Sequence, residues 1–492
     1  MMQTRVTRPN TKLDVVMVTP EASPFAKTGG LGDVLGALPG ALEQLGATVS
    51  LVMPAYHFVL HGAASIQETG ISFTVPVSDR KERAIILKSS LGRNVSVYFV
   101  RNDKYFDREY LYGTSEGDYA DNAERFVFFN RAALELVRMS PPRVLHCHDW
   151  QAALSVAFLK SQPSWYPELA SVKTVMTVHN LGYQGLFGYP DWHLLNLDPG
   201  LFTARYLEFY SRMNFLKGGL VFADAITTMS PSYAEEIKTT ENGFGLDGVF
   251  RERAAQLVGI LNGVDYDIWN PENDHLIARQ YGLQNLAGKK ACKTDVQRSL
   301  GLAEEPDVPL IGMVSRLAGQ KGLDLIETAF DKLLSRKLQF VLLGSGDMYY
   351  EDFFRQAAAR YPGKAAARVT FNEAVAHQIV AGADILLMPS RYEPGGLTQI
   401  YGMKYGTVPI VRATGGLKDT VTEFDPATGQ GTGFLFIPYT ADAFLAAVGR
   451  TLACFRKKRQ WAKLIKNTMT ADFSWSRSAE MYLKLYRKLL ND

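Results

Sequence analysis

The sequence predicts an α/β protein built from two doubly wound, Rossmann-like domains. In both halves of the chain, short apolar runs rich in β-branched residues alternate with longer segments of helical periodicity. This alternation is typical of parallel sheets covered by helices. The chain has 492 residues, and a typical size of about 150 residues per domain makes two large domains the simplest arrangement.

The short apolar runs are the predicted strands of two sheets. The first sheet is predicted from residues 15–19, 48–53, 95–100, 144–146 and 172–178, with 225–230 as the strand that closes it. The second sheet is predicted from residues 310–315, 340–343, 368–371, 385–388 and 408–411. A helical stretch follows each run of the second series, as the crossover between parallel strands requires.

The predicted N-terminal domain covers residues 1–259, and the predicted C-terminal domain covers residues 260–470. The join is placed near Asn262-Gly263, because Asn-Gly marks a tight turn. Residues 471–492 have helical periodicity, and we expect this helix to pack back on the N-terminal domain. Open parallel sheets bind ligands beyond the carboxyl ends of their strands, so we expect the two domains to face each other across a cleft.

Composition excludes several classes of protein. Hydrophobic residues make up 47% of the chain, which is ordinary for a globular protein. Its 53 basic residues nearly balance its 50 acidic ones, so the chain has no large net charge that would attract nucleic acid or a membrane surface. No apolar run approaches the roughly 18 residues of a membrane span, and no signal sequence precedes the first strand. The widely separated Cys147, Cys292 and Cys454 suggest no disulfide framework. We therefore expect a cytoplasmic protein without nucleic-acid or membrane partners.

A glycine-rich turn with a lysine follows the first predicted strand. Gly29 and Gly30 let the backbone approach a ligand closely, and the helix that follows presents unpaired N–H groups. Lys27 adds a positive charge, and Asp33 ends the motif. The spacing matches neither a P-loop nor a full dinucleotide motif. The turn is a candidate phosphate pocket, and the alternative is a flexible loop with a solvated lysine.

Two cations follow the first strand of the second sheet. Arg316 comes directly after that strand, and Lys321 follows five residues later. Fixed cations at a strand end suit a diphosphate, because they neutralise the charge that grows as a sugar–phosphate bond breaks. The alternative is a pair of surface cations at a helix start, where positive charge is mildly unfavourable.

An acidic residue lies in the turn that follows residues 385–388. Glu393 is part of a Pro/Gly turn that leads into a helix, so its carboxylate could accept hydrogen bonds from sugar hydroxyls. The backbone N–H groups of Gly396, Leu397 and Thr398 are candidates for binding phosphate. The alternative is an ordinary acidic residue at a helix N-terminus.

A fourth group contains three histidines. His146 and His148 alternate like zinc ligands, but no third and fourth ligand lies at a familiar spacing, so no metal site is predicted. Asp149 and His179 follow neighbouring strands and are better explained as hydroxyl-binding groups. The alternative for each histidine is a hydrogen-bonded core residue.

Together these motifs resemble those of bacterial glycogen synthases and plant starch synthases. The resemblance extends from about residue 13 to residue 480, with the motifs in the family's order. Two positions depart from the family pattern, because Gly395 replaces a cysteine and Gln151 replaces a histidine. The motifs are Lys27 to Asp33, His148-Asp149-Trp150, His179-Asn180-Leu181, Asn262-Gly263-Val264-Asp265, Arg316 with Lys321-Gly322, Glu393 to Gln399, and Thr414-Gly415-Gly416-Leu417.

The resemblance implies the GT-B glycosyltransferase architecture and a defined reaction. Members of the family transfer glucose from ADP-glucose to the non-reducing 4-hydroxyl of an α-1,4-glucan such as glycogen. The anomeric configuration is retained, ADP is released, and neither a metal nor another cofactor takes part. In the mechanism ascribed to the family, the acceptor attacks from the face that the leaving group departs from.

The resemblance also implies roles for individual residues. Arg316 and Lys321 would stabilise the departing ADP diphosphate, Glu393 would bind the glucosyl hydroxyls, and His179 would lie near the reacting sugar. Phe371 occupies the place of an aromatic residue that contacts adenine. The implied catalytic set is Lys27, His179, Arg316, Lys321 and Glu393, and the implied substrate-binding set is Gly29, Gly30, Asp33, Asp149, Asn262, Phe371, Gly396, Leu397 and Thr398.

Two other functions stay open on the sequence alone. A UDP-sugar transferase or epimerase on the same fold would share the diphosphate-binding parts. A catalytically inactive glucan-binding relative is the non-enzymatic alternative, although such a protein would have no use for a diphosphate pocket. None of the motifs indicates an oligomeric state.

Overall fold

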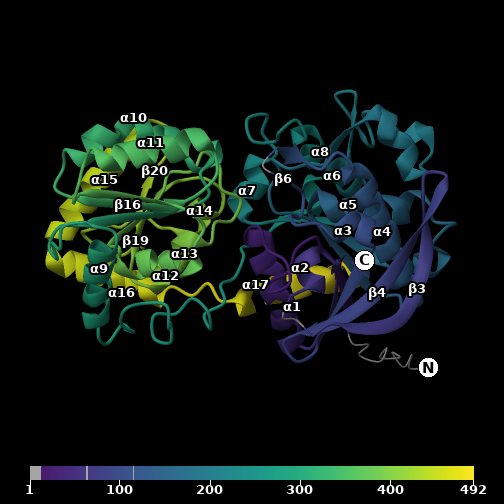
Figure 1. Cartoon of the computed structure of the whole chain (residues 1–492), viewed down its shortest axis with the longest axis horizontal. Coiled ribbons are helices and arrows are strands. Elements are labelled where there is room, and N and C mark those ends of the chain that lie inside the picture. Colours follow the sequence, from purple (N-terminus) through teal and green to yellow (C-terminus); the bar gives the residue numbers. More distant parts are fainter. Residues whose placement is uncertain (1–12, 63–64, 115, 492) are drawn as a thin grey trace, which may run out of the picture. The chain divides into compact units, whose positions relative to one another are not determined.

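A nine-stranded sheet and a six-stranded sheet form the centres of two units of the chain (Figure 1). The structure is a computed structural model that describes residues 13–62, 65–114 and 116–491. Two short two- and three-stranded sheets lie in loops. Unit 1 comprises the described residues of Met1–Met229, Ala234–Gly263 and Trp475–Asp492, and unit 2 comprises Ser230–Tyr233 and Val264–Ser474.

The boundary between the units follows Gly263, at the Asn262-Gly263 turn near which the sequence predicted the join and four residues after the predicted domain limit at 259. Nothing in the sequence indicates that residues 230–233 belong to the second unit. Hydrogen bonds hold them there, because the Ser230 hydroxyl donates to the Pro394 carbonyl at 2.7 Å and the Ser232 hydroxyl donates to Asp419 Oδ1 at 2.6 Å.

Unit 1 is built on a sheet with the strand order β14-β13-β9-β8-β1-β2-β5-β4-β3. Neighbouring strands from β14 to β5 are parallel, whereas β4 pairs antiparallel with both β5 and β3. The bounds are β1 Asp14–Val18, β2 Thr48–Pro54, β3 Gln67–Val77, β4 Arg80–Leu91, β5 Val95–Arg101, β8 Val144–His148, β9 Lys173–Val178, β13 Ala225–Thr228 and β14 Leu257–Gly259.

The sequence prediction missed one edge of this sheet and misplaced the other. Strands β3 and β4 have many exposed or half-exposed residues, so they lack the continuous apolar run that marks the buried parallel strands. The strand predicted to close the sheet at 225–230 is β13, and β14 lies beyond it, with Ile226 paired to Leu257.

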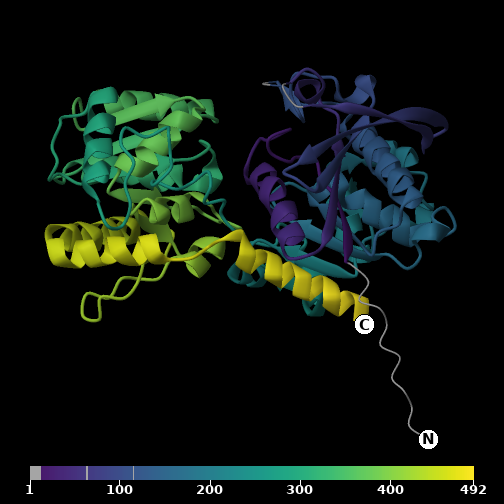
Figure 2. The ribbon, with the colours of Figure 1, turned by 90° about the horizontal axis from the view of Figure 1, so that it is seen from below.

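The last helix of the chain lies on unit 1. Helix α17 (Trp475–Asn491) packs beside α1 (Gly30–Gln44) (Figure 2). The hydroxyl of Tyr486 on α17 lies 2.8 Å from Nδ1 of His146 on β8. Among the described residues, every helix is too short or too polar to span a bilayer. The other helices of unit 1 include α2 His57–Leu60, α3 Asp103–Phe106, α4 Asn122–Met139, α5 Asp149–Ser161, α6 Phe215–Phe222 and α8 Asp247–Glu252.

Unit 2 has a parallel sheet with the strand order β17-β16-β15-β18-β19-β20. The order runs outward in both directions from β15, as in a doubly wound nucleotide-binding domain. The bounds are β15 Leu310–Val314, β16 Gln339–Gly344, β17 Ala365–Val369, β18 Ile385–Met388, β19 Val408–Arg412 and β20 Phe434–Phe436. Strand β17 begins three residues before the predicted run 368–371, and the sequence prediction did not include β20.

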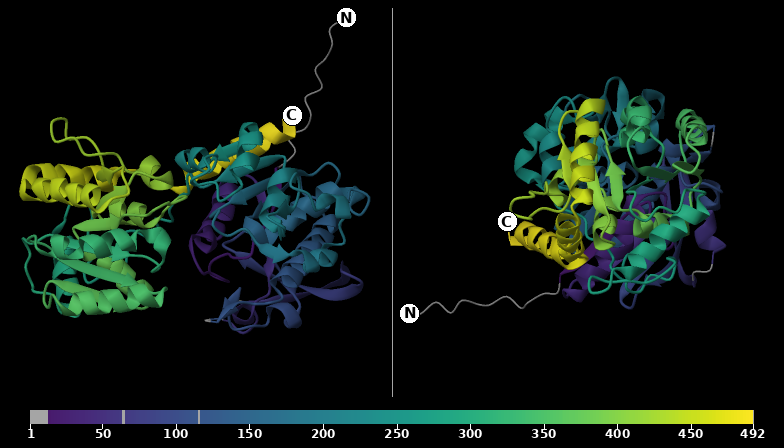
Figure 3. Two further views of the ribbon diagram at one scale, coloured as in Figure 1. Left: turned by 90° about the horizontal axis from the view of Figure 1, so that it is seen from above. Right: turned by 90° about the vertical axis from the view of Figure 1, so that its left-hand side faces the viewer.

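Helices cover both faces of this sheet (Figures 1 and 3). Alternate side chains of β16 pack on opposite faces of the sheet. Phe340 and Leu342 belong to one core cluster, and Val341 and Leu343 belong to another. The helices are α9 Ala287–Ser299, α10 Leu323–Leu334, α11 Met348–Ala359, α12 Glu373–Gly382, α13 Thr398–Lys404, α14 Gly415–Thr420, α15 Ala441–Arg456 and α16 Lys458–Thr470.

Candidate active site

The glycine-rich turn of unit 1 connects β1 to the start of α1. Gly29 is the N-cap residue of α1, no side chain caps the helix there, and Gly30 is its first residue. Uncapped N–H groups at a helix start can bind anionic oxygen. Lys27 Nζ lies 2.7 Å from Asp33 Oδ1, and both side chains are about one-third exposed. The predicted cation is therefore held at the helix start by a carboxylate of the same motif.

A buried carboxylate that sequence reasoning missed supports this turn. Both oxygens of Glu21 are engaged, because the Thr28 amide donates to Oε2 at 2.6 Å and the Thr28 hydroxyl donates to Oε1 at 2.6 Å. The Tyr112 hydroxyl also donates to Oε1, at 2.7 Å. Since Glu21 is 3% exposed, these bonds fix the residue that follows Lys27. The only sequence signal was the position of Glu21 soon after β1.

Asp149 and His179 follow two neighbouring strands, β8 and β9, and contact each other. The backbone amide of His179 donates to Asp149 Oδ1 at 2.7 Å. Asp149 has a φ of +56°, in the left-handed region that non-glycine residues seldom occupy. Burial raises the pKa of Asp149 to about 7, and nearby Glu21 adds to the rise. The Asp149 carboxyl therefore gains or loses its proton close to neutral pH.

His179 is the last of three neighbouring buried histidines, with His148 beside it and His146 beside His148. His146 Nε2 lies 2.5 Å from the Thr177 hydroxyl, and His148 Nδ1 lies 3.0 Å from His179 Nε2. Burial lowers the pKa of His146 and that of His179 to about 3, and it holds the pKa of His148 well below its usual range. All three rings are neutral at physiological pH, so His179 can serve as a hydrogen-bonding group but not as a fixed cation. Thr177 and Tyr486 engage both ring nitrogens of His146, which explains it as a core residue.

Asn262 lies just after β14 and is 8% exposed. Its amide Nδ2 approaches Met229 Sδ at 3.3 Å, while its Oδ1 has no hydrogen-bond partner among the described residues. A buried amide oxygen without a partner is costly unless a ligand binds it. This observation favours a binding role for Asn262.

In unit 2, Lys321 and Glu393 form a buried ion pair. Lys321 Nζ lies 2.7 Å from Glu393 Oε2, and the two side chains are 16% and 8% exposed. The Ser390 hydroxyl donates to the same oxygen at 2.9 Å. The sequence placed Lys321 and Glu393 after different strands and gave no sign that they touch. Ser390 belongs to the same predicted turn, but the sequence assigned it no role.

Close backbone contacts hold this region together. Gly322 has a φ of +72°, and a Cβ at this position would lie 2.0 Å from the Pro389 carbonyl oxygen. A Cβ on Gly416 would lie 1.9 Å from the Gly395 carbonyl oxygen. These glycines let the turns after β15 and β19 reach the Glu393 turn. Gly396 has a φ of +63°, followed by Leu397 and Thr398 at the start of α13.

Arg316 and Phe371 have exposed side chains in unit 2. Arg316 follows β15, next to the Ser315 hydroxyl, which is buried and has no hydrogen-bond partner among the described residues. Phe371 follows β17 and is 83% exposed. An aromatic side chain this exposed contributes little to the core, so its position is compatible with stacking on a planar ligand.

Four of the candidate residues, two in each unit, follow strands at which the strand order reverses. In unit 1, β1 lies between β8 and β2, and the Lys27 turn and Asp149 follow β1 and β8. In unit 2, β15 lies beside β18, and Lys321 and Glu393 follow these two strands. Such switch points are where doubly wound sheets bind nucleotides and related ligands.

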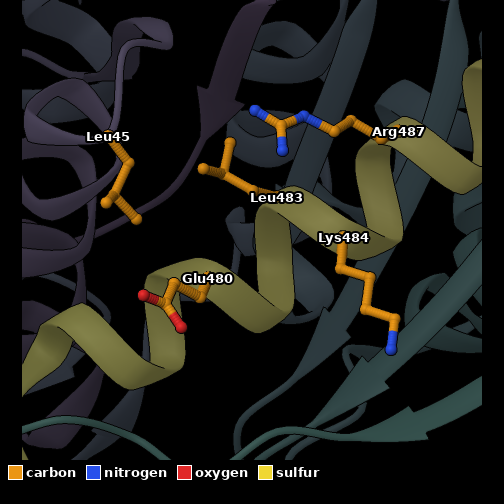
Figure 4. Close-up of a pocket in the computed structure, with 5 residues that line it drawn as sticks. All are labelled: Leu45, Glu480, Leu483, Lys484 and Arg487. Carbon is orange, nitrogen blue, oxygen red and sulfur yellow. The ribbon is translucent and has the colours of Figure 1, made fainter.

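One pocket lies away from these strand ends. It is an open hollow of about 440 Å³ between the end of α1 and helix α17 in unit 1 (Figure 4). None of its lining residues is a predicted site residue, so we assign it no role in the reaction. The lining residues are Leu45, Glu480, Leu483, Lys484 and Arg487.

Comparisons with known proteins agree with this geometry. The family model described as "Starch synthase catalytic domain" matches residues 14–252, and "Glycosyl transferases group 1" matches residues 298–468. The glycogen synthase of Koribacter versatilis is 47% identical over 97% of this chain and 98% of its own length. That of Syntrophotalea carbinolica is 46% identical over 97% of this chain and 99% of its own length. This chain belongs to the glycogen synthase family.

Solved structures extend the comparison. The catalytic domain of starch synthase IV from Arabidopsis thaliana, bound to ADP and acarbose, matches with a TM-score of 0.90 and 32% identity, covering 98% of this chain and 100% of that one. A sucrose-phosphate synthase from Thermosynechococcus elongatus, with a TM-score of 0.59 and 19% identity, shares the fold alone. The glycogen synthase family assignment confirms the predicted GT-B architecture of two Rossmann-like domains.

Membership of the glycogen synthase family also settles the class of activity. The protein is a glycosyltransferase with glycogen synthase function, as the sequence predicted. Its substrates are a nucleotide-sugar donor and a glucan acceptor.

Proposed function

We propose that the donor is ADP-glucose and that the enzyme extends the non-reducing end of an α-1,4-glucan with retention of configuration. The ADP and acarbose bound to the starch synthase IV neighbour support the choice of an adenine nucleotide and a glucan-like acceptor. The observation that carries the proposal is the Lys321–Glu393 ion pair at the switch point of unit 2. It places a cation suited to phosphate beside a carboxylate suited to sugar hydroxyls.

In unit 2, Arg316 and Lys321 would stabilise the negative charge that grows on the diphosphate as the glucosyl bond breaks. Lys321 and Ser390 both bind Oε2 of Glu393, which leads us to assign the sugar hydroxyls to Oε1. The N–H groups of Gly396, Leu397 and Thr398 would bind phosphate oxygen at the start of α13. Because protein cations carry the leaving-group charge, the proposed reaction uses neither a metal nor another cofactor.

In unit 1, the proposed roles concern the sugar. Neutral His179 and the Asp149 carboxyl would hydrogen-bond hydroxyls near the reacting carbon, and Asn262 Oδ1 would accept a hydrogen bond from a further hydroxyl. Lys27, Gly29 and Gly30 would bind donor oxygen atoms at the start of α1, with Asp33 holding Lys27 in place.

An ADP-release assay tests the proposal directly. Purified protein is given glycogen with ADP-glucose or with UDP-glucose, and nucleotide release and labelled glucan are measured side by side, with and without EDTA. We expect turnover with ADP-glucose that EDTA does not reduce and that Glu393→Gln abolishes. A strong preference for UDP-glucose would overturn the donor assignment. Glycogen binding without ADP release would indicate an inactive glucan-binding relative.

A further inference from the structure

Two histidines and an aspartate on the surface of unit 1 form a cluster that the reaction does not use. His57 Nδ1 lies 2.6 Å from Asp107 Oδ1, and His61 Nε2 lies 3.7 Å from the same oxygen. The two imidazole rings have centroids 4.4 Å apart. One ligand atom from each of the three residues lies within 4.8 Å of the others, and no other metal-type group of this kind occurs among the described residues.

The backbone brings these three side chains together from two neighbouring strand ends. His57 is the first residue of α2, and His61 follows its last residue, so the two are four positions apart and share one helix face. Asp107 follows α3, which comes after β5, while α2 comes after β2. Strands β2 and β5 are parallel neighbours in the sheet. A ligand held by all three residues would tie two loops of this sheet edge together.

We propose that His57, His61 and Asp107 bind a divalent transition-metal ion of the zinc type. Two imidazole nitrogens and one carboxylate oxygen are a ligand set that zinc accepts, with water in the fourth position. Ligand atoms in a tetrahedral zinc site with bonds of about 2.0–2.1 Å lie about 3.3 Å apart. The present separations are close enough to this value for side-chain rotation to complete the site.

The surrounding charges favour a cation there. The hydrogen bond from Arg101 lowers the pKa of Asp103, and the nearby His61 ring adds to this decrease. Arg101 Nε donates to Asp103 Oδ1 at 2.8 Å, and the charges of Glu68 and Asp107 also act on this arginine, so carboxylates outnumber the single arginine here. Calcium and magnesium prefer oxygen ligands, so we expect the two imidazoles to exclude them.

The ion would stabilise the loops without entering the chemistry. None of the three ligands belongs to the residues assigned to glucosyl transfer. Tyr56, next to His57, is buried and lies close to Tyr112, whose hydroxyl donates to Glu21 beneath the Lys27 turn. The site therefore adjoins the framework that supports this turn. An EDTA-resistant reaction and a zinc site at this position are independent results.

Titration of the full-length, tag-free protein tests the site. Isothermal titration with Zn²⁺, and the visible absorption of added Co²⁺, are measured for the wild type and for the double variant His57→Ala/His61→Ala. We expect about one ion per wild-type chain, no competition from Mg²⁺, and affinity lower by at least about tenfold in the double variant. Asp107→Asn should weaken binding in the same direction.

The matched control is His193→Ala/His275→Ala, which removes two exposed histidines elsewhere. This control should bind Zn²⁺ like the wild type, and circular dichroism should show that every variant is folded. Equal Zn²⁺ affinity in the wild type and in His57→Ala/His61→Ala would overturn the proposal. So would loss of binding in the control alone.

Discussion

Lys321 Nζ lies 2.7 Å from Glu393 Oε2, although the two residues are 72 positions apart in the chain. The pair joins the turn after β15 to the turn after β18, and both side chains are largely buried. Removing one member of a buried ion pair leaves an uncompensated charge, which typically costs about 3–5 kcal/mol. We therefore expect that replacing either residue weakens the stabilisation of the leaving-group charge and also disturbs the geometry of the two turns.

Lys321→Ala should lower kcat much more than it lowers glucan binding. If the lysine acts mainly on transition-state charge, the loss corresponds to about 2–4 kcal/mol. Steady-state kinetics with saturating glycogen measure this effect, and thermal unfolding measures the cost of the unpaired Glu393. Lys332→Ala, on the exposed face of α10, is the control and should change neither. An unchanged kcat in Lys321→Ala would remove this residue from the mechanism.

Phe371→Ala should weaken donor binding without loss of stability. The Phe371 side chain is 83% exposed, so its removal costs the core little, while stacking of an aromatic ring on a base contributes about 1–3 kcal/mol. We expect a raised KM for ADP-glucose and a weaker Kd for ADP, at an unchanged melting temperature. Ile437→Ala, at 73% exposure, is the matched control. Equal ADP affinity in wild type and Phe371→Ala would contradict the assigned adenine contact.

Asp149→Asn should stabilise the protein in a pH-dependent way. Burial raises the folded-state pKa to about 7 from an ordinary value of 3.8, so the folded protein disfavours the ionised carboxylate. The contribution of the Asp149 carboxyl to the unfolding free energy of the wild type is fully present below about pH 4. It is lost as the pH rises toward 7. The variant's advantage in unfolding free energy should be up to about 4 kcal/mol at pH 8 and should shrink by pH 5. Urea unfolding at several pH values measures it, and a pH-independent difference would contradict the shift.

The sequence was informative where one local signal was enough. Buried parallel strands such as β18 are continuous apolar runs, and the turns after them carry the chemistry, so Lys321 and Glu393 could be chosen from the sequence. Their mutual contact could not, because it depends on how β15 and β18 pair. Glu21 was missed for a similar reason, since one of its partners, Tyr112, lies 91 positions away. The antiparallel edge β3–β4 was missed because its strands are only partly buried.

The three buried histidines predict loss of stability in acid. Burial lowers the folded-state pKa of His146 to about 3, from an ordinary value of 6.5. The unfolded chain takes up a proton at this residue below about pH 6.5, whereas the folded protein does not. This contribution to stability is therefore complete above about pH 6.5 and is lost as the pH falls toward 3. His179 and His148 contribute in the same direction.

His146→Gln should make the fall in stability less steep, because the variant side chain does not titrate. Between pH 6.5 and 4, the slope of the unfolding free energy against pH should decrease by up to about 1.4 kcal/mol per pH unit. The variant should be less stable at pH 8, since it disturbs the contacts with Tyr486 and Thr177. Asp149→Asn provides an internal comparison of opposite sign, because removing a carboxyl with a raised pKa steepens the same slope. Parallel wild-type and His146→Gln curves would show that His146 is not kept neutral in the folded protein.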